Sequence, residues 1–330
     1  MDISNWTPTL STIGLAALSY ISYKLTRQAS IYLLPSTLPH YNPSGKNWAL
    51  VTGATDGIGL GFCQELCSRG FNVILHGRNR EKLVQRAREL NAAFPGQKTG
   101  IVVLDVVGMS DGVDDVAEQV RRIIGNEGKL SVLVNNVGGE TRPSVTLGTL
   151  KYADVDATID KNARFMAQIT RVLLPLLSEG QGQSGLVLNV SSLSQYGLPY
   201  ICIYSATKGF VDSFTKALEA ECSAERCGVE VMGLRIGEVK TAGYDVESTL
   251  FVPQARTLAK AGLDRVGCGK VIVWAYFWHW LQGLSFEIMP RWILMRATVG
   301  RMMAIKKREE EKASKSHSGL SQIYTIPTKH

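Results

Sequence analysis

The sequence predicts an α/β fold in three layers, with a doubly wound parallel sheet between two layers of helices. Short apolar runs of strand length alternate with amphipathic stretches of helical length through the middle of the chain. This alternation is typical of βαβ units whose sheet is buried on both faces. A glycine-rich turn at residues 52–59 joins the first apolar run to the first amphipathic stretch, where such folds bind nucleotides.

The expected elements follow one another in order. We expect strands at 48–52, 72–76, 101–104, 131–134, 186–190 and 229–234, and helices at 57–69, 80–94, 111–124 and 203–226, with a further long helix ending near Leu177. The chain has no repeat of solenoid length and no internal linker. Residues 47–266 are therefore expected to form one domain, after an anchor and linker at 1–46 and before a helical extension with a charged tail at 267–330.

Composition narrows the classes of function. The 330 residues are 45% hydrophobic and 20% charged, which is enough for a large core and excludes a disulfide miniprotein or a disordered tail. Lys and Arg number 36 against 29 for Asp and Glu, a mild excess without a basic stripe, so no nucleic-acid partner is expected. The six cysteines are scattered without a CxxC pair, which favours a reducing compartment and no metal site.

The N-terminus has the character of a membrane anchor. No charged side chain lies between Asp2 and Lys24, and residues 6–23 are mainly apolar, close to the ~20 residues that span a bilayer. Ser and Thr residues dilute the run, which leaves an interfacial helix and a packed soluble helix as alternatives. Because Lys24, Arg27 and Lys46 follow the run, the positive-inside bias predicts that the rest of the chain faces the cytosol.

The end of the chain is rich in aromatic residues. They gather at 271–284, and residues 291–303 add three arginines after Pro290. A Trp-rich, Arg-bearing segment of this kind can lie on a membrane. The alternative is that the aromatic side chains cover a substrate pocket or a subunit contact. The charged run at 306–315 is expected to be a solvated helix end that leads into a disordered tail.

The turn at residues 52–59 predicts a dinucleotide site. Its three glycines permit a tight turn, close approach of backbone to a pyrophosphate, and close packing of helix on strand. The helix N-terminus would face the phosphates. The cofactor-binding residues expected here are Gly53, Thr55, Asp56, Gly57, Ile58 and Gly59.

The expected cofactor is NADPH or NADP+. Where an NAD enzyme places an acidic residue after the second strand, this chain has Arg78. A guanidinium can hold the 2′-phosphate and stack on the adenine, whereas a carboxylate would repel that phosphate. The alternative is that Arg78 is a solvated loop charge. Asp105, after the third strand, is expected to contact the adenine amino group, and Val106 to flank the ring.

Tyr204 and Lys208 indicate acid–base chemistry. Their four-residue spacing at the start of a predicted helix places the phenol and the ammonium on one face. A cation there is expected to lower the pKa of the phenol toward a range useful for proton transfer. The pair follows Asn-Val-Ser-Ser at 189–192, a strand end where a hydroxyl can bind the substrate oxygen.

In combination these motifs resemble the short-chain dehydrogenase/reductase family, which has a Rossmann fold. The resemblance covers about residues 48–241: the glycine turn, Asn-Asn-Val-Gly at 135–138, Asn162, the strand end at 189–192 and Tyr-x-x-x-Lys stand in the family's order and spacing. The Asn-Asn-Val-Gly variant, the apolar N-terminus and residues 279–292 resemble one branch. That branch holds membrane-bound 17β-hydroxysteroid dehydrogenases of types 3 and 12 and very-long-chain 3-oxoacyl-CoA reductases, which implies the endoplasmic reticulum and lipid metabolism.

The resemblance implies roles for single residues. Tyr204 would be the general acid that protonates the carbonyl oxygen, and Lys208 would hold the ribose hydroxyls. Ser192 would stabilise the developing alkoxide, and Asn162 would hold a water of the proton relay. The other residues implied to bind the cofactor are Asn135, Gly138, Tyr204, Lys208, Val239 and Thr241, the last at the nicotinamide carboxamide.

Two positions depart from the family pattern. Members commonly place the tyrosine thirteen positions after the serine, a count that Ser191 satisfies, whereas Ser192 satisfies the motif alignment with a loop one residue shorter. We expect Ser192 to be the active serine and keep Ser191 as the alternative. Ile236 and Gly237 stand where the family commonly has Pro-Gly, so the loop before the nicotinamide contact is less well predicted than the reaction class.

The predicted function is an NADPH-dependent ketone reductase acting on a hydrophobic 3-oxoacyl-CoA or keto-steroid substrate. One alternative is a ketoreductase that tailors a polyketide or terpenoid, since specificity lies in the unpatterned stretches 139–147, 194–203 and 241–262. Another is a non-catalytic NADP-binding scaffold at a membrane. Expected partners are the substrate, a membrane and a second copy of the chain, paired through the helices around Asn162 and Tyr204.

Overall fold

The computed structural model describes residues 7–108, 112–126, 128–140, 144–180, 185–244 and 246–321. In this part of the chain, seven strands form one parallel sheet in the order β3-β2-β1-β4-β5-β6-β7. The strands are β1 (Trp48–Thr52), β2 (Asn72–Gly77), β3 (Thr99–Val103), β4 (Leu130–Asn135), β5 (Gly185–Val190), β6 (Val229–Arg235) and β7 (Ile272–Trp274). The strand order reverses direction beside β1, which makes the sheet doubly wound and confirms the predicted fold class.

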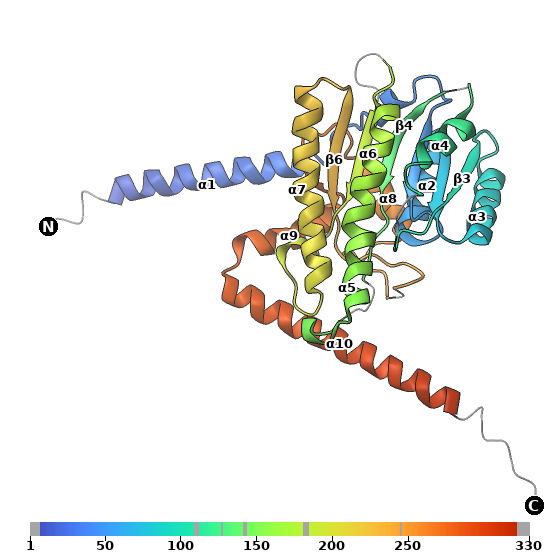
Figure 1. The fold of residues 1–330 in the computed structure, drawn as a ribbon. Helices are drawn as coiled ribbons and strands as arrows, with labels where there is room; N and C mark the ends of the chain where they lie inside the picture. Colours follow the sequence, from blue (N-terminus) through green and yellow to red (C-terminus); the bar gives the residue numbers. More distant parts are fainter. Residues whose placement is uncertain are drawn as a thin grey trace, which may run out of the picture.

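Helices cover both faces of the sheet (Figure 1). One core contains side chains of α2 (Gly57–Ser68), α3 (Arg80–Ala93) and α8 (Ala255–Leu263), and the other contains those of α4 (Val116–Ile124), α6 (Phe165–Leu177) and α7 (Cys202–Ala224). Neighbouring residues of one strand point to opposite cores: Ala49 and Val51 to the first, Trp48 and Leu50 to the second. This explains why the strands are apolar runs without polar alternation.

The predicted strands and helices are present, with differences at their boundaries. The third strand begins two residues before its predicted start. The helix predicted at 111–124 begins only at Val116, after turns at 112–115, and its predicted first residue, Asp111, lies outside the described residues. The long helix before Leu177 consists of three parts: α5 (Tyr152–Ile159), a π-helical turn η4 (Asp160–Arg164) and α6. Strand β7 was not predicted, because its three residues lie in the aromatic-rich segment and are too few to show a period.

The N-terminal helix α1 (Thr7–Ser30) points away from the body of the molecule (Figure 1). Its apolar side chains are exposed, Leu15 at 68% and Leu18 at 64%. Neither α1 nor any other described helix has the apolar length that crossing a bilayer requires. The spanning anchor expected from the sequence is therefore unconfirmed, and membrane attachment stays a prediction.

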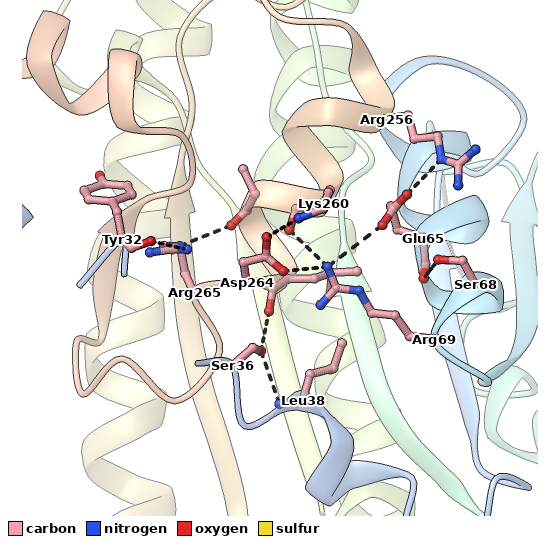
Figure 2. A network of polar contacts seen from close by, with 12 residues as sticks. Tyr32, Ser36, Leu38, Glu65, Ser68, Arg69, Arg256, Lys260, Asp264 and Arg265 are labelled. Atoms are coloured by element: carbon pink, nitrogen blue, oxygen red, sulfur yellow. Dashed lines mark hydrogen bonds and ion pairs between the residues drawn. The ribbon is translucent and has the colours of Figure 1, made fainter. Parts of the chain in front are cut away.

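The segment after α1 is held against α8 (Figure 2). Arg265 donates hydrogen bonds to the carbonyls of Ile31 and Tyr32, and its guanidinium lies 4.8 Å from the centre of the Tyr32 ring. The Ser36 hydroxyl donates to the carbonyl of Leu263 at 2.7 Å. These contacts fix the point from which α1 leaves the domain.

The C-terminal extension packs on the domain through α9 (Phe277–Ile288) and continues as α10 (Arg291–Ser321). Trp274 and Trp280 are buried, whereas Trp292 is 71% exposed. The rings of Phe277 and Trp280 also pack against Tyr32, at centroid distances of 5.4 and 6.1 Å. Part of the aromatic segment thus packs on the domain, and part of it is exposed to solvent. All six cysteines are unpaired.

Candidate active site

The glycine turn follows β1 as expected and leads into α2. Gly53 and Gly57 have φ angles of +67° and +55°, which favour glycine. A Cβ atom at Gly59 would stand 2.1 Å from the carbonyl oxygen of Gly53. The Asp56 carboxylate caps α2 by accepting from the Gly57 N–H at 2.6 Å. The turn therefore presents the helix N-terminus at the carboxyl edge of the sheet, where a pyrophosphate can bind.

Asn136 clamps this turn, a role that sequence reasoning missed. Its side-chain amide donates to the carbonyls of Thr52 and Gly53 at 3.0 and 3.4 Å. The Thr52 hydroxyl in turn accepts from the backbone N–H groups of Asn136 and Val137 at 2.9 and 3.0 Å. Asn136 is the second asparagine of Asn-Asn-Val-Gly, so that motif could have indicated this role. Its hydrogen bonds join the carboxyl ends of the neighbouring strands β1 and β4.

The first asparagine lies deeper than the cofactor edge. Asn135 donates through its amide to the hydroxyl of Thr170 and to the side-chain oxygen of Asn189, both at 2.8 Å. Asn189 continues the chain to the hydroxyl of Thr215 at 3.0 Å. These buried hydrogen bonds connect β4 and β5 to α6 and α7. The Asn135 side chain therefore fixes the positions of these elements from inside the core.

The expected adenine-side residues lie at the ends of β2 and β3. Arg78 follows β2 and is exposed, and Asp105 follows β3 and is exposed beside the buried Val106. Lys161, on η4, has its pKa lowered by burial and further by the charge of Arg78, while Glu140 opposes the shift. Two cations thus lie at this edge of the sheet, and their combined positive charge favours the binding of an anionic group.

Tyr204, Lys208 and Ser192 come together as the sequence predicts. The Nζ atom of Lys208 lies 5.6 Å from the centre of the Tyr204 ring and donates to the carbonyl of Val190 at 2.9 Å. The Ser192 hydroxyl interacts with the Tyr204 side chain. Ser191, by contrast, is fully buried and directed at the backbone of Lys208, 3.5 Å from its carbonyl. Of the two serines, Ser192 is the one that faces the tyrosine.

The pKa of Tyr204 differs in direction from the expectation. Burial raises it to about 12, with the Ser192 and Ser194 hydroxyls lowering it and the Glu140 carboxylate raising it. Burial also lowers the pKa of Lys208 to about 8, against the opposing charge of Asp212. Desolvation outweighs the attraction between phenolate and ammonium that the spacing suggested. The phenol therefore keeps its proton at neutral pH.

Asn162, on the π-helical turn η4, binds the backbone of the loop that follows β4. Its side-chain oxygen accepts from the Gly139 N–H at 2.9 Å, and its nitrogen donates to the carbonyls of Gly139 and Thr158 at 2.9 and 2.8 Å. A Cβ at Gly138 would stand 2.9 Å from that oxygen and 3.2 Å from Lys208 Nζ. Gly138, Asn162 and Lys208 therefore meet at one point, and the π-helical turn at Asn162 departs from regular helix there.

The loop after β6 completes the site. The methyl group of Thr241 lies where a Cβ at Gly57 would contact it at 3.1 Å, so Thr241 abuts the glycine turn. Val239 is buried two residues before it. The carbonyl of Ile236 accepts from the N–H of Leu193, next to Ser192, at 2.8 Å. The loop thus runs from the serine to the glycine turn, and the nicotinamide contact of Thr241 stays a prediction.

Glu140 is a second residue that sequence reasoning did not identify. Burial raises its pKa to about 7, opposed by the Ser144 backbone and by Lys161. Lys161 also donates to the Glu140 carbonyl at 3.1 Å. The carboxyl lies close enough to Tyr204 to shift its pKa. No motif signals this residue, because it lies in the unpatterned stretch after Asn-Asn-Val-Gly.

Comparison with known proteins agrees with this geometry. Residues 47–248 match the family model for short chain dehydrogenases. The very-long-chain 3-oxoacyl-CoA reductase of Mus musculus is 30% identical, over 92% of this chain and 96% of that protein. The enzyme of the same name from Anas platyrhynchos is 33% identical, over 80% of this chain and 84% of that protein.

Solved structures share the fold. A 7β-hydroxysteroid dehydrogenase superposes with a TM-score of 0.65 at 20% identity, covering 76% of this chain and 96% of that one. A metagenomic short-chain oxidoreductase solved in complex with NADP superposes with a TM-score of 0.57 at 26% identity, covering 69% and 96%. The mouse relative thus matches 92% of this chain, whereas these two structures cover 76% and 69% of it.

Proposed function

The chain belongs to the short-chain dehydrogenase family, and we propose that it reduces a ketone on a hydrophobic acyl thioester, using NADPH. It is an NADP-dependent oxidoreductase that acts on CH–OH and C=O groups. The finer assignment, to very-long-chain 3-oxoacyl-CoA, comes from relatives that match nearly the whole chain. Keto-steroids are the second substrate class that the proposal covers.

The residues present fit NADPH. Gly59 lets α2 pack directly against the glycine turn, so that the helix directs its N-terminus to the place where a pyrophosphate can bind. Arg78, with Lys161 near it, can hold the 2′-phosphate at the end of β2. Lys208, buried at the meeting point with Gly138, can donate to ribose hydroxyls. The cofactor supplies the hydride when bound.

The roles of the side chains follow from their positions. Tyr204, protonated at neutral pH, donates its proton to the ketone oxygen as negative charge develops there. The Ser192 hydroxyl, beside Tyr204, stabilises the same oxygen by a hydrogen bond. Both N–H groups of the Asn162 amide are used by backbone carbonyls, and its oxygen, which accepts from Gly139, has a second lone pair with which it can hold a water of the proton relay. The Lys208 ammonium then passes a proton toward Tyr204.

One observation carries the proposal: Ser192, Tyr204, Lys208 and Asn162 converge at the carboxyl edge of β4 and β5, next to the glycine turn. Purified protein should oxidise NADPH in the presence of a long-chain 3-oxoacyl-CoA, and the product should be the 3-hydroxyacyl-CoA by mass spectrometry. Tyr204→Phe should lower turnover by roughly 100-fold or more while NADPH still binds.

The controls separate the rival functions. Ser191→Ala should leave most of the activity, because that hydroxyl points away from Tyr204, whereas Ser192→Ala should not. NADPH binding without turnover on acyl thioesters, steroids and other ketones would favour a non-catalytic scaffold. Turnover by Tyr204→Phe at the wild-type rate would refute the mechanism.

We further propose attachment to the endoplasmic reticulum with the domain in the cytosol. The exposed apolar side chains of α1 and the exposed Trp292 support a helix that lies on or in a lipid surface. Flotation of the full chain with vesicles should be lost when Leu15 and Leu18 are both replaced by Asp. A homodimer through α6 and α7 also stays a prediction; the exposed Phe210 on α7, stacked on Phe214, is the side chain to test.

A further inference from the structure

A buried imidazole from the C-terminal extension contacts the loop after β6. His279, on α9, is 0% exposed. Its Nδ1 atom accepts from the N–H of Gly237 at 3.0 Å. Its Nε2 atom lies 3.1 Å from the carbonyl oxygen of Glu238 and 3.2 Å from that of Phe251. Since an N–H faces Nδ1 and carbonyls face Nε2, only the neutral tautomer with its proton on Nε2 satisfies all three contacts.

The imidazole of His279 packs closely against the backbone at Gly237. A Cβ atom at Gly237 would stand 2.8 Å from Cδ2 of His279, so the glycine is required for the imidazole to approach. This is where the family's usual Pro-Gly is Ile-Gly in this chain. A proline would fix the loop from its own backbone, whereas here three hydrogen bonds from another element fix it.

The loop that His279 holds lies between the two halves of the site. Its first residue, Ile236, accepts from Leu193 beside Ser192, and its end, Thr241, abuts Gly57 of the glycine turn. A shift of this loop would therefore move the serine segment and the phosphate turn relative to each other. Positional errors of an ångström at such a place are enough to lower turnover strongly.

The extension makes further contacts with the same region. Arg301 of α10 donates to the Glu238 carboxylate at 2.6 and 3.1 Å. Glu287 of α9 accepts from the Tyr196 hydroxyl at 2.9 Å, and Phe286 stacks on the Tyr196 ring at 5.2 Å. Tyr196 lies four residues after Ser192. The extension therefore contacts both the loop at 236–241 and the segment that follows Ser192.

We propose that His279 is a positioning residue of the active site, which, as a neutral imidazole, fixes the loop at 236–241 between Ser192 and the glycine turn. The C-terminal extension is in this case part of the catalytic apparatus, whether or not it also touches a membrane. The inference rests on the proposed function for its effect on turnover, but the order of the loop can be measured without it.

The surroundings keep the imidazole neutral. The charged and titratable groups that face it are Glu238 on the loop, Arg301 of α10, which is paired with Glu238, and Tyr276, whose ring lies 5.3 Å away. Burial lowers the pKa of His279 to about 4, opposed by the Phe251 and Glu238 backbone and the Glu238 charge. A protonated ring would direct a second N–H at the N–H of Gly237, so the loop would be released near pH 4.

The test compares His279→Phe, which keeps a ring but none of the hydrogen bonds, with His279→Asn, whose side-chain oxygen can still accept from Gly237. His40→Asn, at an exposed position, is the matched control. Hydrogen exchange of residues 236–252 and kinetics with NADPH and a 3-oxoacyl-CoA are measured on the full chain. His279→Phe should raise exchange in this segment and lower kcat by roughly 10- to 100-fold, the effect of unpaired buried groups. His279→Asn should recover most of the activity.

The acid side of the pH profile gives a second readout. In the wild type and in His40→Asn, kcat should fall near pH 4 as the imidazole takes up a proton, and this limb should be absent in His279→Asn. An unchanged limb in that variant, or wild-type kcat and exchange in a folded His279→Phe, would overturn the proposal.

Two further outcomes are still decisive. If His279→Phe does not fold, His279→Leu, which also removes all three hydrogen bonds, replaces it, and wild-type exchange at 236–252 in that variant contradicts the proposal. If the wild type turns over no ketone, the proposed function fails. Raised exchange at 236–252 in the His279 variants, with weaker NADPH binding, would then still support the positioning role.

Discussion

Gly59 lies so close to Gly53 that a Cβ atom on it would stand 2.1 Å from the Gly53 carbonyl oxygen. The first turn of α2 is thereby pressed against the turn that follows β1. The Asn136 amide holds the same carbonyl from the side of β4. The shape of the phosphate-binding turn thus depends on an interaction between residues that are six positions apart and on a strand far along the chain.

Gly59→Ala should weaken NADPH binding. The added methyl group must push the helix from the turn, at a cost of roughly 1–3 kcal/mol, which corresponds to about 5- to 150-fold in affinity if it falls on the bound state. A fluorescence titration with NADPH measures it. Gly148→Ala, where a Cβ meets nothing within 4 Å, is the control and should bind as the wild type does. Equal affinities in the two variants would contradict the close approach.

Glu140→Gln should move the alkaline limb of reduction to lower pH. The negative charge of Glu140 raises the pKa of Tyr204, and reduction needs the protonated phenol. Removing that charge lets the tyrosine lose its proton at lower pH, and kcat/KM against pH reports the shift. Glu81→Gln, exposed on α3, should leave the limb in place. A limb that stays fixed in Glu140→Gln would mean that the carboxyl does not act on Tyr204.

Asp212→Asn should make NADPH binding more sensitive to alkali. Burial lowers the pKa of Lys208 to about 8, and the Asp212 charge is what opposes this shift. Without it, Lys208 becomes neutral at lower pH and loses its attraction for the cofactor. The NADPH dissociation constant measured from pH 6 to 9 should rise earlier than in the wild type. Glu221→Gln, exposed on the same helix, serves as the control.

The same substitution should also destabilise the fold. Asp212 is ion-paired with the guanidinium of Arg235 at 2.8 Å, and both side chains are largely buried. Leaving the arginine unpaired costs roughly 3–5 kcal/mol. Thermal unfolding should show the loss in Asp212→Asn but not in Glu221→Gln. An unchanged melting temperature would mean that Arg235 finds another partner, such as Tyr196, whose hydroxyl it already contacts at 3.4 Å.

His76→Phe should flatten the acid side of the stability curve. The buried His76 ring stacks on Phe165 at a centroid distance of 4.9 Å. Burial lowers its pKa to about 4, against the usual 6.5. Its stabilising effect is therefore complete above pH 6.5 and is lost as the pH falls toward 4, a loss of roughly 3 kcal/mol.

Urea unfolding at pH 7 and at pH 5 measures this difference. In His76→Phe the loss between the two pH values should be smaller than in the wild type, since the phenyl ring keeps the stacking and takes up no proton. His40→Phe, at an exposed site, should unfold with the wild-type pH dependence. If His76→Phe loses as much stability as the wild type between these values, another group carries the acid sensitivity.

Sequence reasoning placed the local motifs of the candidate site on the elements where the structure has them. The glycine turn, Arg78 and the Tyr204–Lys208 pair follow from spacing within one element, because a strand–turn–helix unit fixes such positions whatever surrounds it. It did not find Glu140, which acts on Tyr204 from a different element. It also did not single out Asp212, although this residue lies four positions after Lys208 on the same helix, a spacing that local reasoning could have used. It also gave the wrong direction for the pKa of Tyr204, because burial depends on how the loops close over the hydroxyl.

The alternation of apolar runs and amphipathic stretches determined by itself that this chain forms a doubly wound parallel sheet with a dinucleotide turn after its first strand. The period of a strand or helix is a property of neighbouring residues, so it can be read along the chain. Only the tertiary structure decided that Ser192 and not Ser191 faces Tyr204. It also decided that residues 272–274 form the edge strand beside β6, and that His279 accepts a hydrogen bond from Gly237. These depend on burial and hydrogen bonds between residues far apart in sequence, which no local pattern encodes.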